Sequence, residues 1–360
     1  MNAARRLDRL RERLGRDGLD ALAVTDPVNV TYITGFDAVF DFEPAHVALV
    51  DAQRALLITD GRYEQSAREA ASQTSWEVQV AESHAVATLV RAAGELGRLG
   101  IEDSMPLARF KQLEAAFPGA LVATSGLLLD MRQVKEPEEI ARIEAAQAIT
   151  DAAFAHIVEF IAVGRTEREI ALELEFYMRT HGSEGVAFAS IVASGPNSAK
   201  PHAQVTDRRL HAGDLLKLDF GARVEGYCSD MTRTVCLGPA ADWQREVYGA
   251  VAEANAAGIA AVVAGRPASD VDATARAVLQ AAGFEERFTH GLGHGLGLEV
   301  HERPGVSKRN NDPLPEGAVI TIEPGVYLPE QGGVRIEDLV VVEQAGCRVL
   351  TRSPKELLEL

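Results

Sequence analysis

Two aspartates flank a turn in the segment LKLDFGARVEGYCSDMTRT. Asp219 ends an apolar run, and Asp230 follows 11 residues later. A hairpin with Val224 and Glu225 at its tip would place the two carboxylates directly opposite each other, with Cβ atoms about 5 Å apart. A slip of one residue would destroy this pairing. Because adjacent carboxylates repel each other, such a pair persists only around a shared proton or a bound cation.

A second acidic hairpin is expected in the segment TIEPGVYLPEQGGVRIED, where Glu323 and Glu337 flank a loop centred on Glu330. This spacing again makes the two flanking acids cross-strand neighbours. Either hairpin alone is explained more simply as a solvated acidic face. Two such hairpins, each with its acids among apolar strand residues, are harder to explain in that way.

Three histidines follow one another in the segment THGLGHGLGLEVHERP: His290, His294 and His301. Four glycines within seven residues would destabilise a helix, which excludes a helical zinc motif of the HExxH type. Glycine instead lets the backbone come close to a neighbour while the imidazoles point into a cleft. A single histidine is usually a structural core residue, but three within twelve residues weaken that interpretation. A further histidine, His202, falls in a loop between two expected strands.

Four carboxylates and one imidazole form an oxygen-rich set of donors for two divalent cations. Such a set favours Mn²⁺, with Co²⁺ or Zn²⁺ as alternatives. Two metal ions held about 3.5–4 Å apart generate a hydroxide nucleophile and stabilise the transition state of a displacement. The residue types therefore predict metal-assisted hydrolysis.

The elements around these motifs indicate an α/β protein of two domains. A mixed α/β pattern runs to about residue 123, and the charged, proline-containing segment at residues 131–140 then interrupts it. Polar linkers of this kind are typical of domain boundaries, which gives domains at residues 1–130 and 131–360. The second domain has the order helix, helix, strand, strand twice, which suggests two related halves. Residues 166–169 fit a capping box that begins one of its helices.

The composition excludes several classes of function. The chain has 360 residues and a net charge of −17, and such an acidic surface repels phosphate backbones. Its three cysteines form neither a CxxC pair nor an even-numbered disulfide set. The N-terminus has no apolar core of a signal peptide, and no stretch approaches the length of a membrane-spanning helix. We therefore expect a cytoplasmic protein that binds neither nucleic acid nor membrane.

The ordered set Asp219, Asp230, His294, Glu323 and Glu337 resembles the five-ligand signature of the pita-bread metallopeptidases. This family includes methionine aminopeptidase, aminopeptidase P, prolidase and creatinase. The surrounding words LDFGARVEGYCSDMTRT, GHGLGLEVHE, TIEPGVY and GGVRIED are most similar to its Xaa-Pro branch, as are NVTYITGF and LLITDGRYEQSA near the N-terminus. The resemblance covers nearly the whole chain. It implies a creatinase/prolidase-like N-terminal domain followed by a catalytic pita-bread domain with pseudo-twofold helix–strand halves.

The resemblance also implies a set of metal ligands. Asp219 would hold one metal ion, and Asp230 and Glu337 would bridge both ions. His294 and Glu323 would complete the shell of the second ion, and Glu323 would also shuttle the proton. Creatinases lack part of this set, so that relative is disfavoured.

Five further residues receive roles from the same resemblance. His202 and His301 would line the substrate pocket, where they stabilise the tetrahedral intermediate and contact a carbonyl of the substrate. His290 and Arg335 would support the site from its edge. Thr232 would orient one of the ligand carboxylates.

The resemblance leaves the length of the substrate open. Prolidases similar to the archaeal ones carry an arginine directly after the HE-x-P motif, and this chain has Gly305 there. An arginine at that position would bind the free carboxylate of a dipeptide. Its absence favours an Xaa-Pro aminopeptidase, with an Xaa-Pro dipeptidase as the alternative and a non-catalytic peptide-binding protein as a third reading. In each case the partners would be small proline-containing peptides.

Relatives of the prolidase type close the active site with a partner subunit, so the resemblance also implies a homodimer. The segment FDAVFDFEP, residues 36–44, carries three phenylalanines that would suit an exposed contact loop. The alternative is that these rings pack within their own domain.

Overall fold

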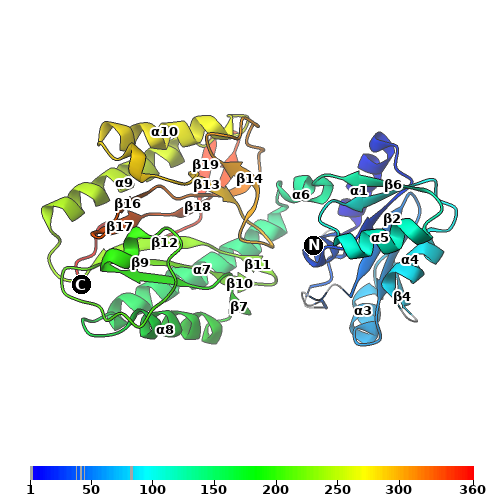
Figure 1. The fold of residues 1–360 in the computed structure, drawn as a ribbon, viewed down its shortest axis with the longest axis horizontal. Helices are drawn as coiled ribbons and strands as arrows, with labels where there is room; N and C mark the ends of the chain where they lie inside the picture. The colour runs from blue at the N-terminus through cyan, green and yellow to red at the C-terminus, as the bar shows by residue number, and fades with distance from the viewer. Residues whose placement is uncertain (1–2, 38, 41–42, 44, 82–83) are drawn as a thin grey trace. The chain divides into compact units, whose positions relative to one another are not determined.

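A computed structural model describes residues 3–37, 39–40, 43, 45–81 and 84–360. The chain forms two compact units, Met1–Met131 and Arg132–Leu360. Each unit has its own β-sheet structure, as Figure 1 shows, and its own apolar core. The two are therefore described separately.

The first unit is built on one mixed sheet of six strands in the order β4-β3-β2-β1-β5-β6. β2 pairs antiparallel with both β1 and β3, and the outer pairs are parallel. The strands are β1 (Ala21–Val24), β2 (Val47–Asp51), β3 (Ala55–Thr59), β4 (Trp76–Val80), β5 (Arg98–Glu102) and β6 (Ala120–Thr124). The helices are α1 (Ala3–Asp17), α2 (Pro27–Thr34), α3 (Glu64–Ala71), α4 (Ala85–Ala93), α5 (Leu107–Ala116) and α6 (Leu127–Arg132), the last of which ends at the first residue of the second unit.

The second unit repeats two helices followed by strands. Its first half consists of α7 (Pro137–Phe160), α8 (Glu167–Thr180), β7 (Gly185–Val186), β8 (Ile191–Ser194), η1 (Gly195–Ala199), β9 (Leu215–Phe220), β10 (Ala222–Val224), β11 (Tyr227–Cys228) and β12 (Met231–Cys236). Its second half consists of α9 (Asp242–Ala261), α10 (Ala268–Ala281), η2 (Glu285–Arg287), β13 (Gly293–Gly295), β14 (Glu302–Val306), β15 (Val319–Ile322), β16 (Gly325–Leu328), β17 (Gly332–Arg335), β18 (Asp338–Glu343) and β19 (Gly346–Val349). Among the described helices of the whole chain, none is long and apolar enough to cross a lipid bilayer.

The helices of the two halves cover opposite sides of the strands in the second unit (Figure 1). α7 and α8 pack on β8, β9 and β12 around a core that includes Leu174 and Leu218. α9 and α10 pack on the second sheet, of order β14-β13-β15-β18-β19, around Val251 and Ile320. The capping box predicted at Thr166 is confirmed, because its hydroxyl accepts from Glu169 N at 3.1 Å. The strands between the two helix pairs are buried on both sides.

The register of the first acidic hairpin differs from the predicted one by two residues. Asp219 lies opposite Thr232, not opposite Asp230. The turn residues are Glu225 and Gly226, with φ of 46° and 80°. A two-residue turn of type I′ needs positive φ at both positions, and glycine adopts it without strain, so the tip lies one residue further on. A shift of two residues preserves the sheet face, which keeps Asp219 and Asp230 on the same side.

The register of the second acidic hairpin is confirmed. Gly325 pairs with Arg335 in one ladder, and Ile322 pairs with Asp338 in the next. Both ladders have the spacing that places Glu323 across from Glu337. Glu323 and Glu337 lie between the two ladders, where neither residue belongs to a paired strand.

The aromatic segment near residue 40 packs within its own unit where it is described. Phe36 is buried, and its ring lies 6.3 Å from both the Phe40 and the Trp76 rings. Phe40 in turn lies 4.4 Å from the His46 ring. The expectation of an exposed contact loop is therefore wrong for Phe36, while Phe42 lies outside the described residues. The prediction of a homodimer gains no support from this segment.

A close backbone contact at Gly293 makes the second sheet sensitive to a single methyl group. A Cβ at this position would lie 1.9 Å from the carbonyl oxygen of Thr321 in β15. We expect Gly293→Ala to lower the free energy of unfolding by about 3 kcal/mol, because backbone atoms cannot move aside cheaply. Gly305→Ala is the matched control, since its Cβ would meet nothing within 4 Å. Denaturant titration of both variants measures the difference in their free energies of unfolding. Equal stabilities would contradict the close contact between Gly293 and Thr321.

Candidate active site

The predicted site residues other than Thr232 line one cavity in the second unit. Its volume is about 440 Å³. Carboxylates and histidines occupy much of its wall, and Phe188, Ile191 and Val300 add apolar side chains. The lining residues are Phe188, Ala189, Ile191, His202, Asp219, Asp230, His290, Gly291, Gly293, His294, Val300, His301, Glu323, Arg335 and Glu337.

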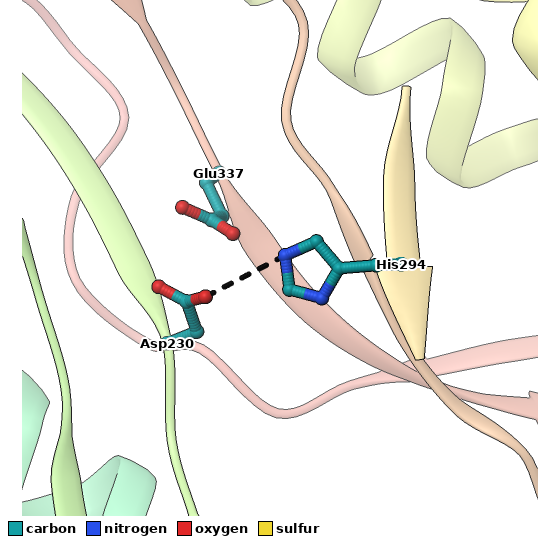
Figure 2. A group of neighbouring side chains, drawn as sticks. All are labelled: Asp230, His294 and Glu337. Atoms are coloured by element: carbon teal, nitrogen blue, oxygen red, sulfur yellow. Dashed lines mark ion pairs between the residues drawn. The ribbon is translucent and has the colours of Figure 1, made fainter. Parts of the chain in front are cut away.

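Three of these residues form a group with metal-ligand spacing. One ligand atom from each of Asp230, His294 and Glu337 lies within 4.8 Å of the other two, and Figure 2 shows the three side chains facing one another. The Nε2 atom of His294 lies 3.7 Å from Asp230 Oδ2. Its Nδ1 atom is 3.1 Å from the carbonyl oxygen of Gly295, which suits an Nδ1–H donor. In that tautomer the lone pair of Nε2 points at the carboxylates.

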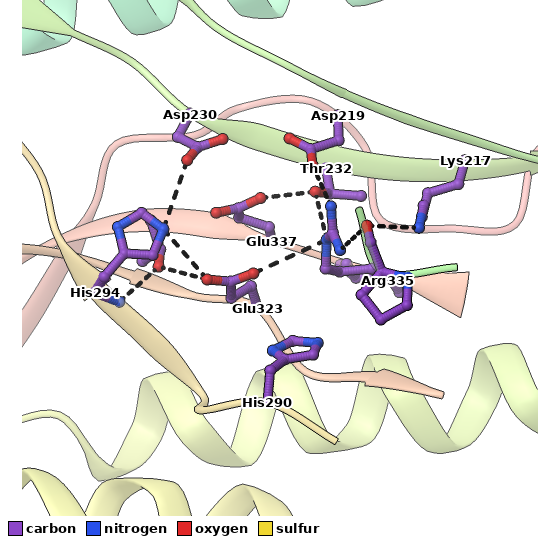
Figure 3. Close-up of polar contacts among 12 residues, drawn as sticks. Lys217, Asp219, Asp230, Thr232, His290, His294, Glu323, Arg335 and Glu337 are labelled. Atoms are coloured by element: carbon purple, nitrogen blue, oxygen red, sulfur yellow. Dashed lines mark hydrogen bonds and ion pairs between the residues drawn. The ribbon is translucent and has the colours of Figure 1, made fainter. Parts of the chain in front are cut away.

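The other two predicted ligands lie beside Arg335 (Figure 3). Arg335 forms an ion pair with Asp219 through Nη2, and its Nε lies 3.9 Å from Glu323 Oε2. The other oxygen of Glu323 lies 3.3 Å from His294 Nε2. Arg335 is 3% exposed, so the expectation that it supports the site from its edge is wrong. It is a buried cation among the acids.

Burial and mutual repulsion raise the pKa values of the acids. Desolvation raises the pKa of Asp230 well above its ordinary value, and the charges of Glu337 and Asp219 raise it further. The pKa of Glu337 is raised for the same reasons. Burial raises the pKa of Glu323 to about 7, although Arg335 opposes the shift. Burial lowers the pKa of His294 below its ordinary value, which favours its neutral, ligating form.

These observations fit a divalent cation. Asp230 Oδ1 and Glu337 Oε1 are buried without a hydrogen-bond partner among the described residues. Buried carboxylate oxygens without partners are costly, and a cation between them would satisfy both. Oxygen and imidazole donors together suit borderline and hard divalent metals. The residues present therefore match the ion that the sequence predicts.

A second layer of hydrogen bonds orients the acids. The Thr232 hydroxyl donates to Glu337 Oε2 at 2.7 Å and accepts from Arg335 Nε at 2.9 Å. Arg335 Nη1 also donates to the Tyr327 hydroxyl at 3.1 Å, and that hydroxyl lies 2.8 Å from His290 Nε2. Burial lowers the pKa of His290 to about 3, so its ring is neutral near pH 7. Thr232 thus contacts one of the ligand carboxylates, and His290 reaches the acids through Tyr327.

Two histidines lie at the open side of the cavity. The His301 ring stands edge-on to the His294 ring, with centroids 4.4 Å apart. His202 and His301 are both exposed residues on the cavity rim. Phe188 and Ile191 form the apolar wall. A substrate in this space would contact imidazoles, carboxylates and an apolar surface.

Sequence reasoning missed Tyr327, Lys217 and the ion network around Glu302. Tyr327 is in the segment TIEPGVY, and its regular hairpin position gives no sign that its hydroxyl joins His290 to Arg335. Lys217 is a lysine inside the apolar run LLKLDF, which is a visible signal of an unusual buried charge. Glu302 directly follows His301, and its carboxylate accepts hydrogen bonds from Arg132 and Lys135. No spacing rule connects residues more than 160 positions apart.

The sequence matches metallopeptidase family M24 over residues 141–344 and the creatinase/prolidase N-terminal domain over residues 6–134. The chain belongs to metallopeptidase family M24. Members of this family depend on divalent metal ions, which agrees with the donor set of the cavity. The predicted order of a creatinase-type domain and a pita-bread domain is confirmed.

Several relatives are similar over their full length. The Xaa-Pro dipeptidase of Pyrococcus horikoshii is 35% identical over 348 residues, which cover 96% of this chain and 97% of the relative. The structure of an Xaa-Pro dipeptidase from Bacillus anthracis has 37% identity and a TM-score of 0.94, with 100% of both chains covered. The X-Pro aminopeptidase of Thermotoga maritima has 36% identity and a TM-score of 0.89, and 99% of this chain and 100% of that chain are covered.

The raised pKa of Glu323 predicts how the stability of the metal-free protein depends on pH. A folded-state pKa of about 7, against an ordinary 4.5, means that folding favours the protonated form. The stabilisation is therefore present below pH 4.5 and is lost as the pH rises to 7, by on the order of 1–3 kcal/mol. Unfolding titrations at pH 5 and pH 7 in a chelator measure this loss.

Glu323→Gln should reduce the difference between these two pH values, because the amide does not titrate. Glu286→Gln changes an exposed glutamate of the same unit and should leave the difference unchanged. If wild type and Glu323→Gln lose the same free energy of unfolding between pH 5 and pH 7, Glu323 does not titrate in this range.

Proposed function

We propose that this protein hydrolyses the peptide bond before proline, and that its best substrates are Xaa-Pro dipeptides. The observation that carries the proposal is the convergence of four acids, His294, His202 and His301 on one cavity. The relatives from Pyrococcus horikoshii and Bacillus anthracis are Xaa-Pro dipeptidases, which supports it. The preference for dipeptides replaces the aminopeptidase reading as the main hypothesis.

Two divalent ions are proposed to bind through the five predicted ligands. Asp230, Glu337 and His294 already have the spacing of one such site. Asp219 and Glu323 lie beside Arg335 and supply the remaining carboxylates. Manganese is the first candidate, with cobalt and zinc as alternatives, because carboxylate oxygens dominate the set. When bound, such ions lower the pKa of a water molecule and polarise the substrate carbonyl.

The chain's own groups would move the proton and stabilise charge. Glu323 lies at the cavity wall and can take a proton from the attacking water and deliver it to the prolyl nitrogen, which must be protonated to leave. His202 and His301 can each donate an N–H to the oxygen that becomes negative in the tetrahedral intermediate. Arg335 holds the Asp219 carboxylate in place through their ion pair.

The geometry of the wall suits a proline. A prolyl nitrogen carries no N–H, and its ring fixes φ near −65°, so an apolar surface beside the acids can select it. Phe188 and Ile191 provide such a surface.

A second, basic cavity supports the preference for dipeptides. It has a volume of about 380 Å³ and shares His290 and Gly291 with the first cavity. Its other lining residues include Arg276, Lys308 and Arg309. Arg276 is engaged by Asp272, but Lys308 and Arg309 are exposed cations close to the catalytic cavity. These two can attract the free carboxylate of a dipeptide, which Gly305 cannot do.

Asp230→Asn should abolish hydrolysis, with a loss of at least about 10³-fold in kcat, because one proposed bridging carboxylate is lost. The content of divalent metal, measured by elemental analysis, should fall at the same time. Circular dichroism should show a retained fold. Asp103→Asn, which changes an exposed acid of the first unit, is the control and should keep both activity and metal. Full activity of Asp230→Asn after exhaustive chelation would contradict the proposal.

The double substitution of Lys308 and Arg309 by glutamine should raise KM for an Xaa-Pro dipeptide about tenfold, because a carboxylate contact is worth about 1.4 kcal/mol or more. The same enzyme should hydrolyse the corresponding Xaa-Pro amide with unchanged KM, since the amide carries no charge. Lys111→Gln, on the surface of α5, is the matched control.

Hydrolysis of tripeptides as fast as dipeptides by the wild-type enzyme would instead favour the aminopeptidase reading. The similar protein from Thermotoga maritima is an X-Pro aminopeptidase, which is why this alternative is tested. A side-by-side assay of an Xaa-Pro dipeptide and an Xaa-Pro tripeptide separates the two.

A further inference from the structure

A fully buried lysine lies two residues before Asp219. Lys217 is 0% exposed, in the middle of β9. Among the described residues it forms no ion pair with a carboxylate. Burying an ammonium group without a counter-charge is costly, so its hydrogen bonds must offset a large loss of hydration.

Those hydrogen bonds end on the backbone of the loop that contains Lys200, Pro201 and His202, between η1 and β9. Lys217 Nζ donates to the carbonyl oxygens of Lys200 at 2.5 Å and of Pro201 at 3.1 Å. It also lies 5.1 Å from the centre of the Tyr327 ring. Arg335 donates to the same carbonyl of Pro201 at 3.1 Å, and Figure 3 shows Lys217 and Arg335 reaching toward each other. Two buried basic side chains therefore hold the two carbonyls that precede His202.

The next residue, His202, depends on this anchoring. Its imidazole is exposed on the rim of the cavity. Within the described chain, its ring has no hydrogen-bond partner of its own. A side chain on a loop can return to one place only if the backbone that carries it stays in place. The backbone of residues 200 and 201 therefore sets the point from which the His202 side chain extends.

The flanks of the loop are held separately. The buried carboxylate of Glu167 accepts from Ser194 N at 2.7 Å and from Thr206 N at 3.1 Å. It also accepts from Asn197 Nδ2 at 3.1 Å. These contacts fix both ends of the loop but none of its central residues. The Lys200 carbonyl receives its side-chain hydrogen bond from Lys217 alone among the described residues.

We propose that Lys217 is a positioning residue that holds His202 over the scissile bond by binding the carbonyls of Lys200 and Pro201. This inference rests on the proposed role of His202 in hydrolysis. Arg335 cannot replace Lys217, because its donors are shared with Asp219, Thr232 and Tyr327. Lys217 donates no hydrogen bond to the proposed ligand carboxylates, and both of its hydrogen bonds end on the carbonyls of Lys200 and Pro201.

The test is a double-mutant cycle between Lys217→Met and His202→Ala, measured on the metal-loaded enzyme with an Xaa-Pro dipeptide. In the wild-type background, Lys217→Met should lower kcat about tenfold with little change in KM. In the His202→Ala background, the same substitution should change kcat less than twofold, because the residue that it positions is already absent. Metal content should be unchanged in every variant.

Lys217→Gln is a second variant, which keeps N–H donors but removes the charge. It should restore part of the lost kcat, and it keeps the test decisive if the methionine variant does not fold. Equal losses of kcat in both backgrounds would overturn the inference, since they would show a structural or electrostatic effect independent of His202. A wild-type kcat in Lys217→Met, with His202→Ala impaired, would overturn the inference and leave the proposed role of His202 intact. A wild-type kcat in His202→Ala would overturn both the inference and the proposed role of His202.

Discussion

The repulsion among four buried carboxylates is the constraint on which the second unit depends. Asp219, Asp230, Glu323 and Glu337 all face one cavity, and in the described part of the chain Arg335 is the buried cation that pairs with Asp219 and Glu323. Without compensation, such a cluster would favour opening of the strands that carry it. The two helix pairs pack on these strands from opposite sides and bury an apolar core on each side. Burial of this apolar surface supplies the free energy that keeps the acids close.

Part of this arrangement could be predicted because local rules govern it. The register at Glu323 and Glu337 follows from the hairpin length, and the capping box at Thr166 follows from its own four residues. The first hairpin was predicted two residues out of register, because the positive φ of Glu225 and Gly226 moves the turn. Since the side-chain period of a strand is two, the error left Asp219 and Asp230 on one face. The sequence pattern therefore predicts the correct site residues, although it pairs Asp219 with Asp230 instead of Thr232.

What could not be predicted involves contacts between segments distant in the sequence. Arg335 was placed at the edge of the site, whereas it lies among the acids and joins Asp219 to Thr232 and Tyr327. Strand periodicity shows which face of β17 a residue occupies, but the length and direction of an arginine side chain are set by its surroundings. The anchoring of the loop before His202 by Lys217 is of the same kind. Such side-chain-to-backbone bonds leave no spacing pattern in the sequence.

The pairing of Glu302 with Arg132 and Lys135 has a consequence for the exchange of domains. The match to the N-terminal domain ends at residue 134, so a fusion designed from it would take Arg132 from the donor protein. Arg132 nevertheless belongs to the second unit, where its guanidinium and Lys135 neutralise a carboxylate that is 2% exposed. A chimera joined at residue 134 can therefore leave Glu302 with one cation instead of two, next to His301. A junction between residues 131 and 132 keeps the ion network within one parent.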